Sequence, residues 1–152
     1  MEIKKITEKH KVLVDELIKV AFQPYQAIYR IKSTSIGNTF SFESIGVFIE
    51  ERLVAVLSYY QDANMLRLFQ IAVHPEQQGK GFFSVLLAHA EQIALHKGLS
   101  KVGLYTIKQT KAYAYFKQKQ FIIIAQTEAS FAEPVQDGEL LIEYEMHKDL
   151  LC

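Results

Sequence analysis

Cysteine is almost absent from this chain, and proline is scarce. The single thiol is Cys152, the last of 152 residues, so the chain cannot form an internal disulfide or a cysteine-rich zinc site. Only three prolines occur, and no low-complexity segment, linker or internal repeat interrupts the sequence. This length and uniformity predict one domain that covers residues 1–152.

A net charge is also missing. The 17 Lys and Arg residues balance the 17 Asp and Glu residues, which gives 17 − 17 = 0. Without an overall positive field, the chain has no general attraction for a polyphosphate backbone, so nucleic acid is not an expected partner. The apolar share of 49% and the charged share of 22% are those of an ordinary soluble globular protein.

Long apolar runs are absent as well. The apolar run 121–125 is far too short to span a bilayer. Residues 1–5 lack the apolar core of a signal peptide. We therefore expect a cytoplasmic protein with no membrane partner.

The first part of the chain predicts a strand followed by helical segments. Residues 3–6 are typical of a short strand, and Thr7 is a suitable N-cap for a helix that Pro24 closes. The apolar spacing in residues 25–31 suggests a second short helix. Residues 33–38 suggest a loop.

The remainder predicts a meander, a crossover and a closing strand pair. We expect strands at 45–50, 53–61, 65–73, 101–107, 121–125 and 140–147, and helices at 82–97 and 110–119. The unit from 65 to 107 has the size of a parallel crossover, and the other connections are antiparallel. The fold class is therefore α/β, with a mixed, mostly antiparallel twisted sheet and helices on both faces.

One loop, residues 74–81, carries the chemical signal. Gly79 and Gly81 lie between a strand and a helix, where missing Cβ atoms let the backbone approach a ligand closely. The first turn of a helix has unpaired N–H groups and a positive dipole end, and both attract phosphate. Lys80 adds a positive charge. The loop therefore predicts a phosphate or pyrophosphate site.

Two familiar phosphate motifs fit this loop poorly. A Walker A loop needs a glycine five residues before the Gly-Lys pair and Ser or Thr after it, but His74 and Gly81 stand there. A Rossmann fingerprint needs a third glycine, where Ser84 stands, and it should follow the first strand of a doubly wound sheet.

A third motif fits better. The segment resembles motif A of the GNAT superfamily of N-acetyltransferases, written Q/R-x-x-G-x-G/A, and here it reads Gln78-Gly79-Lys80-Gly81-Phe82-Phe83. Residues 109–121 look like the family's later helix with its "FYEKLGF" ending, and residues 146–150 look like its closing M-x-K-x-L strand. The resemblance spans most of the chain.

The resemblance implies an acetyl-CoA cleft between a splayed parallel strand pair, 65–73 and 101–107. Backbone groups of Ile71 and Val73 would pair with the pantetheine arm, amides of residues 78–84 would hold the pyrophosphate, and a backbone N–H at a strand bulge, that of Ile71 or Ala72, would polarise the thioester carbonyl. The residues expected at the cofactor are Ile71, Ala72, Val73, Gln78, Gly79, Lys80, Gly81, Phe82, Phe83, Ser84, Gln109, Ala112 and Phe116.

Several positions depart from the family pattern. Phe83 replaces a Gly or Ala, Gln109 an Asn, Gln120 a Gly and Phe116 the tyrosine that often protonates the departing thiolate. A phenyl ring cannot donate a proton, so the neighbouring Tyr115 is the expected catalytic residue, unless the thiolate leaves unaided. No acidic residue in 65–73 offers a general base for the amine. An ordered water could equally accept the proton of the amine.

The resemblance implies an enzyme that transfers acetyl from acetyl-CoA to a primary amine by direct attack, without a metal. The alternative is a non-catalytic acyl-CoA-binding or regulatory domain. His89 and His96 lie seven apart with no third ligand, so we expect them on the surface. Residues 25–44 and 126–139 are expected to frame the acceptor site, and a homodimer is plausible for this family.

Overall fold

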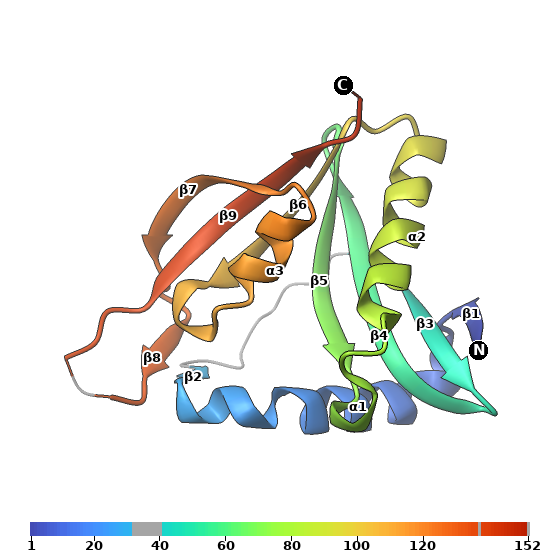
Figure 1. The fold of residues 1–152 in the computed structure, drawn as a ribbon, viewed down its shortest axis with the longest axis horizontal. Coiled ribbons are helices and arrows are strands. Elements are labelled where there is room, and N and C mark those ends of the chain that lie inside the picture. Colours follow the sequence, from blue (N-terminus) through green and yellow to red (C-terminus); the bar gives the residue numbers. More distant parts are fainter. Residues whose placement is uncertain (32–40, 137, 152) are drawn as a thin grey trace.

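The computed structural model describes residues 1–31, 41–136 and 138–151. Its main sheet has 7 strands (Figure 1). In spatial order they are β1 (Glu2–Lys5), β3 (Glu43–Ile49), β4 (Arg52–Asp62), β5 (Met65–Val73), β6 (Lys101–Ile107), β9 (Ile142–Asp149) and β7 (Ile122–Glu128). The β5–β6 pair is parallel and the other pairs are antiparallel, as predicted.

The helices lie at the junctions between these strands. The α-helices are α1 (Lys11–Phe22), α2 (Phe82–His96) and α3 (Tyr113–Gln118). Short 3₁₀ turns flank them, namely η1 (Glu8–His10), η2 (Gln23–Ala27), η3 (Pro75–Gln77) and η4 (Lys108–Thr110). A separate antiparallel ribbon pairs β2 (Tyr29–Ile31) with β8 (Ala132–Pro134). Within the described part of the chain, no helix has both the length and the apolar character needed to cross a bilayer.

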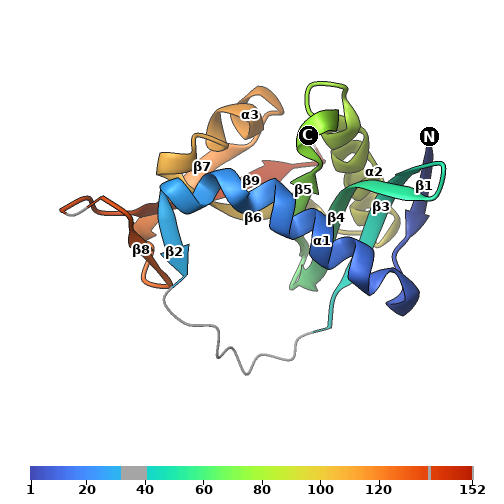
Figure 2. The ribbon, with the colours of Figure 1, turned by 90° about the horizontal axis from the view of Figure 1, so that it is seen from below.

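Helices cover both faces of the sheet, as predicted. On one face, α1 packs Leu17 and Ala21 against a cluster that includes Phe48. On the other face, α2 and α3 cover the larger core, which includes Val47. Val47 and Phe48 face opposite ways because side chains alternate along a strand. Figure 2 shows α1 crossing β4 and β5 and ending near β2.

The second short helix predicted over residues 25–31 is present only as the 3₁₀ helix η2, which ends at Ala27. Pro24 lies at the start of η2, and at its end the Ile28 N–H donates to the Tyr25 carbonyl at 2.9 Å. The chain then becomes extended, and Tyr29 pairs with Pro134 in the β2–β8 ribbon. A tertiary pairing therefore overrides the weak helical spacing. The loop predicted at 33–38 lies outside the described residues.

Three other predicted boundaries change. The segment 126–139 holds the end of β7 and all of β8 instead of a continuous loop. The helix predicted at 110–119 begins only at Tyr113, since Lys111 has φ +65° in the left-handed region and interrupts it. The last strand runs over Ile142–Asp149 instead of 140–147.

The parallel pair β5–β6 is short. The strands pair only at Met65–Lys101, Leu66–Val102 and Arg67–Gly103, and beyond these positions they diverge (Figure 1). This confirms the splayed parallel pair that the resemblance implied.

A bulge in β5 lies just beyond the last paired position. Ala72 lies opposite Val56 and Phe69 opposite Ser58, so two residues of β5 face one residue of β4. Gln70, within the bulge, has φ +48°. A bulge bends its strand and increases the local twist, which accounts for the divergence of β5 from β6.

Leu66→Ala tests how much the last paired positions stabilise the fold. Leu66 is fully buried, and its truncation leaves a cavity beside the β5–β6 pair. We expect the free energy of unfolding, measured by urea denaturation, to fall by about 2–5 kcal/mol. Ile122→Ala on the edge strand β7, where the side chain is 62% exposed, is the control and should change it by less than about 0.5 kcal/mol. Equal losses in the two variants would contradict this description of the core.

Candidate functional site

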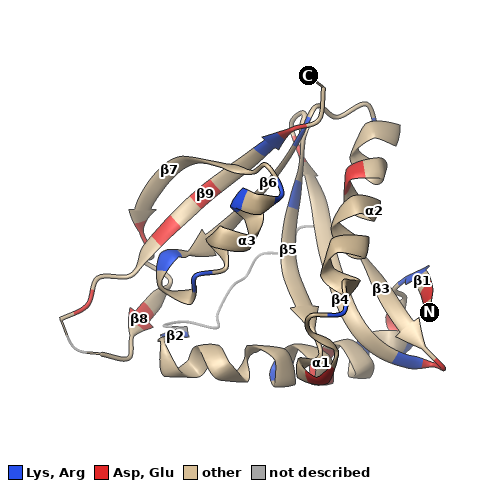
Figure 3. Cartoon of the chain, in the orientation of Figure 1, with Lys and Arg blue, Asp and Glu red and all other residues tan. Residues whose placement is uncertain are grey.

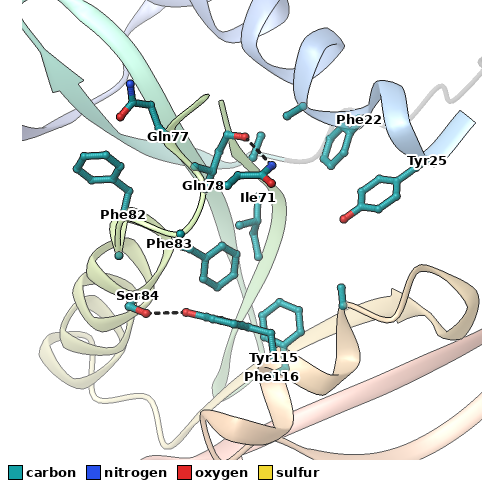
Figure 4. A pocket seen from close by; sticks show the side chains of 16 residues that line it. Phe22, Tyr25, Ile71, Gln77, Gln78, Phe82, Phe83, Ser84, Tyr115 and Phe116 are labelled. Atoms are coloured by element: carbon teal, nitrogen blue, oxygen red, sulfur yellow. Dashed lines mark hydrogen bonds between the residues drawn. The ribbon is translucent and has the colours of Figure 1, made fainter. Parts of the chain in front are cut away.

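A cavity of about 470 Å³ opens where β5 ends and α2 begins. Its walls come from the end of α1, the end of β5, the following loop and α3. Figure 4 shows Phe22 and Tyr25 on one side, Tyr115 and Phe116 on another, and Phe83 and the β5 residues between them. No charged side chain of the described chain lines it.

The loop that leads into α2 exposes its backbone to this cavity. Gly79 and Gly81 have φ +80° and +86°, a region that glycine adopts without steric cost. A Cβ atom added at either position would meet no protein atom within 4 Å. The two glycines are therefore required by the backbone conformation, and the space in front of them is open.

The backbone N–H groups of residues 78–84 have no acceptor within the described residues. The nearest helical bond runs from the Val85 N–H to the Gly81 carbonyl at 3.1 Å. Gly81 has no side chain to cap α2, and the first turn carries no acidic residue. Unpaired N–H groups at the positive end of a 15-residue helix form a favourable site for an anion.

The short helix α3 brings two adjacent aromatic residues to the cavity in different ways. The Tyr115 hydroxyl lies 2.7 Å from Ser84 Oγ in the first turn of α2. Phe116 is only 6% exposed and packs in the main core. The Phe83 ring lies edge-on to both, with centroid distances of 4.6 Å to Tyr115 and 5.6 Å to Phe116. Phe83 therefore supports α3, and the hydroxyl at this wall belongs to Tyr115.

A second cavity of about 260 Å³ lies between the diverging halves of β5 and β6. It shares Ile71, Phe83 and Phe116 with the larger cavity, so the two adjoin. Its lining contains one charged side chain from the described chain, Glu143 on β9. Figure 3 shows the acidic positions along β9 in red, whereas the diverging end of β5 carries no charged residue.

A buried hydroxyl network holds the β5 bulge between these cavities. Ser58, fully buried on β4, lies 2.6 Å from Ser44 Oγ and donates to Gln70 Oε1 at 3.2 Å. Buried polar groups with partners resist rearrangement because an unpaired group would lose a hydrogen bond without gaining water. The network therefore fixes Gln70, and with it the direction of Ile71.

Residues 14–121 match the acetyltransferase (GNAT) family. The chain belongs to the GNAT family. This confirms the resemblance seen in the sequence, and with it the enzyme class, an acyltransferase. Among curated proteins, no sequence matches the chain.

Several solved structures share this GNAT fold. The ribosomal-protein-S18-alanine N-acetyltransferase of Escherichia coli has 15% identity and a TM-score of 0.76 over 97% of this chain and 92% of its own. The PaiA N-acetyltransferase of Thermoplasma acidophilum, in complex with coenzyme A, has 17% identity and a TM-score of 0.72 over 98% and 99%. The IAA acetyltransferase of Bacillus cereus has 19% identity and a TM-score of 0.71 over 98% and 99%.

The larger cavity brings together most of the residues that the sequence predicted for this GNAT site. Those that line it are Ile71, Ala72, Val73, Gln78, Gly79, Gly81, Phe82, Phe83, Ser84, Ala112, Tyr115 and Phe116. Lys80 and Gln109 do not line it. Lys80 is exposed, and its Nζ donates to Gln77 Oε1 at 3.3 Å on the rim of the loop.

Gln109 has a structural position in this GNAT chain. Its Nε2 donates to the Leu140 carbonyl at 2.9 Å, and its Oε1 accepts from the Ile142 N–H at 3.3 Å. Both bonds hold the start of β9 against η4, and they occupy the amide away from the cavity. The expectation that Gln109 contacts the cofactor therefore finds no support in its placement.

Sequence reasoning missed several lining residues. Phe22 reaches the cavities because α1 crosses below β5, and Gln77 comes from η3. Tyr25 also lines both cavities, and it belongs to the segment 25–44 that was expected to frame the acceptor site. Glu143 was missed because its pocket is formed by strands far apart in the sequence. Burial raises the pKa of Glu143 above its usual range, and the nearby Glu145 raises it further. The available signal was the alternation of apolar and acidic residues along 142–149. It places Glu143, between the partly buried Ile142 and the buried Tyr144, on the opposite face of β9.

The described residues contain no group of three or more His, Cys, Asp or Glu side chains placed to hold a metal ion. His89 is exposed on α2, and His96 Nδ1 lies 2.9 Å from the Gln92 carbonyl. This contact with a carbonyl of the last turns is typical of a basic residue near a helix C-terminus.

The Tyr115–Ser84 hydrogen bond should couple α3 to α2. We expect Tyr115→Phe and Ser84→Ala each to lower the free energy of unfolding by about 0.5–1.5 kcal/mol. The double variant should lose less than the sum, with a coupling energy of about 1 kcal/mol in a urea-denaturation cycle. Additive losses would mean that the two hydroxyls do not interact.

Proposed function

We propose that this chain binds acetyl-CoA in the larger cavity and transfers its acetyl group to a primary amine in the smaller one. The observation that carries the proposal is the row of unpaired N–H groups of residues 78–84 beside a strand edge without a partner. The first suits a diphosphate and the second suits an extended amide-containing chain, and coenzyme A contains both in sequence.

The pyrophosphate would bind at the start of α2. Among the residues that the structure describes, no charged one lines the larger cavity, so the backbone N–H groups and the helix dipole supply the attraction. Lys80, on the rim, would add long-range attraction for the phosphates. The T. acidophilum enzyme, crystallised with coenzyme A, has the same fold.

The pantetheine arm would follow the free edge of β5. Beyond Arg67 this edge has no partner strand, so backbone groups at Ile71 and Val73 can pair with the amides of the arm. This direction leads from the loop to the bulge, and the acetyl group would lie where the two cavities adjoin at Ile71.

The reaction would be a direct attack. A neutral amine nitrogen adds to the thioester carbonyl carbon, the C–S bond breaks, and the sulfur leaves as a thiolate. The nitrogen loses one proton and the thiolate gains one, which yields an N-acetylated product and free coenzyme A. A backbone N–H at the bulge, that of Ile71 or Ala72, would stabilise the carbonyl oxygen as it gains negative charge; such a donor contributes about 3 kcal/mol in acyl transfer.

Tyr115 is the proposed proton donor for the thiolate. Phe116 is in the core and cannot donate, whereas the Tyr115 hydroxyl lies at the cavity wall beside Ser84. Ser84 can accept a hydrogen bond from the phenol, and it can donate one to the phenolate after the proton has been transferred.

Non-catalytic binding of an acyl-CoA is the second candidate. The observation that favours it is the buried Phe116, which leaves the family's tyrosine position without a proton donor. Saturable acetyl-CoA binding in calorimetry, without thiol release across a panel of amines, would support this candidate over acetyl transfer.

Gly81→Ala tests the pyrophosphate site. An alanine at φ +86° costs about 1–2 kcal/mol of stability and brings a methyl group into the open space before the amides. We expect acetyl-CoA affinity, measured by calorimetry, to fall about tenfold through the loss of amide contacts. Gly98→Ala is the matched control, because Gly98 has φ +74° and equally open surroundings at the far end of α2. Equal affinity in the two variants would argue against the site.

Tyr115→Phe tests the proton donor. We expect kcat to fall about 100-fold with little change in acetyl-CoA affinity, because only the proton transfer is lost. Tyr113→Phe, on the same helix but outside both cavities, should keep the wild-type kcat. Unchanged turnover of Tyr115→Phe at every pH would remove Tyr115 from the mechanism.

A further inference from the structure

The smaller cavity has an unusual lining for a polar reaction. Aromatic rings dominate it, from Tyr25, Tyr29, Phe69, Tyr105 and Phe131 among others. These rings come from η2, β2, β5, β6 and the segment before β8, so the surface is assembled from distant parts of the chain. An aromatic surface binds apolar groups, and ring faces also attract cations.

Glu143 is the one charged group of the described chain in this lining. On β9 it lies opposite Ile107 of β6 and Thr127 of β7. Among the described residues it makes no ion pair and no side-chain hydrogen bond. A half-buried carboxylate without a partner is costly, so a ligand that brings a positive charge gains from pairing with it.

The neighbouring Glu145 is different. It lies 2.9 Å from both Arg67 Nη1 and His147 Nε2, so its charge is already compensated. Arg67 in turn also pairs with Asp62 at 3.0 Å and lies over the Tyr105 ring at 4.8 Å. Two carboxylates two residues apart on one strand thus differ in availability, and only Glu143 lines the cavity.

We propose that the smaller cavity selects a compact arylalkylamine without a carboxylate of its own, and that Glu143 binds the ammonium group of this acceptor. The inference rests on the proposed acetyl transfer and names its substrate class. At about 260 Å³ the cavity lies below the roughly 300–1,000 Å³ of typical ligand pockets, which favours a small acceptor.

The raised pKa of Glu143 agrees with this role. Burial and Glu145 both disfavour the carboxylate form, and an ammonium partner would restore it. An acceptor with its own carboxylate would place a further negative charge near Glu143 and Glu145, and the described part of the lining holds no cation to compensate it. Amino acids should therefore bind worse than the corresponding decarboxylated amines.

The first test compares two ligands that differ by one carboxylate. Binding of phenethylamine and of phenylalanine is measured by calorimetry in the presence of coenzyme A, so the result does not depend on turnover. We expect phenylalanine to bind at least about tenfold more weakly, because like charges in contact cost several kcal/mol. Phenylalanine binding as well as phenethylamine, or spermidine binding better than both, would overturn the inference.

The second test removes the charge. Glu143→Gln keeps the shape of the side chain, and we expect phenethylamine affinity to fall about tenfold while acetyl-CoA affinity stays at the wild-type value. Glu128→Gln on β7 is the matched control. Glu128 is exposed and lies opposite Ile142, whose side chain packs against the main core, so it faces away from the cavity. Equal phenethylamine affinity in wild type and Glu143→Gln would overturn the inference.

The two tests separate this inference from the proposed function. Loss of acetyl-CoA binding or of all thiol release would remove the acetyl-transfer proposal, whatever the amine preference. Thiol release with an amine, together with unchanged affinity in Glu143→Gln, would keep acetyl transfer and remove the role of Glu143.

Discussion

The divergence of β5 from β6 is the constraint on which the rest of the site depends. The two strands pair at only three positions, and the bulge at Gln70 then turns β5 away. The hydrogen bonds that run from the buried Ser44 through the buried Ser58 to the exposed Gln70 hold this bulge. A strand edge left without a partner inside a fold must find another hydrogen-bonding group, and here both cavities open along that edge.

The two cavities have complementary electrostatics on either side of Ile71. The larger one has no charged lining residue from the described chain but faces unpaired backbone N–H groups at a helix N-terminus, so it favours an anion. The smaller one has aromatic walls and the uncompensated Glu143, so it favours a cation. An acyl donor that carries phosphates and an acceptor that carries an ammonium group would thus be directed to opposite sides of the β5 bulge.

Local patterns in the sequence predicted the parts of this architecture that depend on local physics. The two glycines before an apolar helical stripe predicted the loop and α2, and alternation predicted the main strands. The features that were missed depend on contacts between distant segments. No residue type in Leu68–Val73 predicts a bulge. The Gln109 amide forms hydrogen bonds with residues more than 30 positions away, and β2 exists only because it pairs with β8. The Glu143 pocket likewise needs segments from α1 to β9, far apart in the sequence, to come together.

Amide hydrogen exchange with and without acetyl-CoA tests the central claim most directly. The account predicts slower exchange at the N–H groups of residues 79–84 when acetyl-CoA is bound, and no change at the far end of α2 around Gly98. Saturable binding that leaves exchange at residues 79–84 unchanged would contradict the claim that these unpaired amides hold the diphosphate.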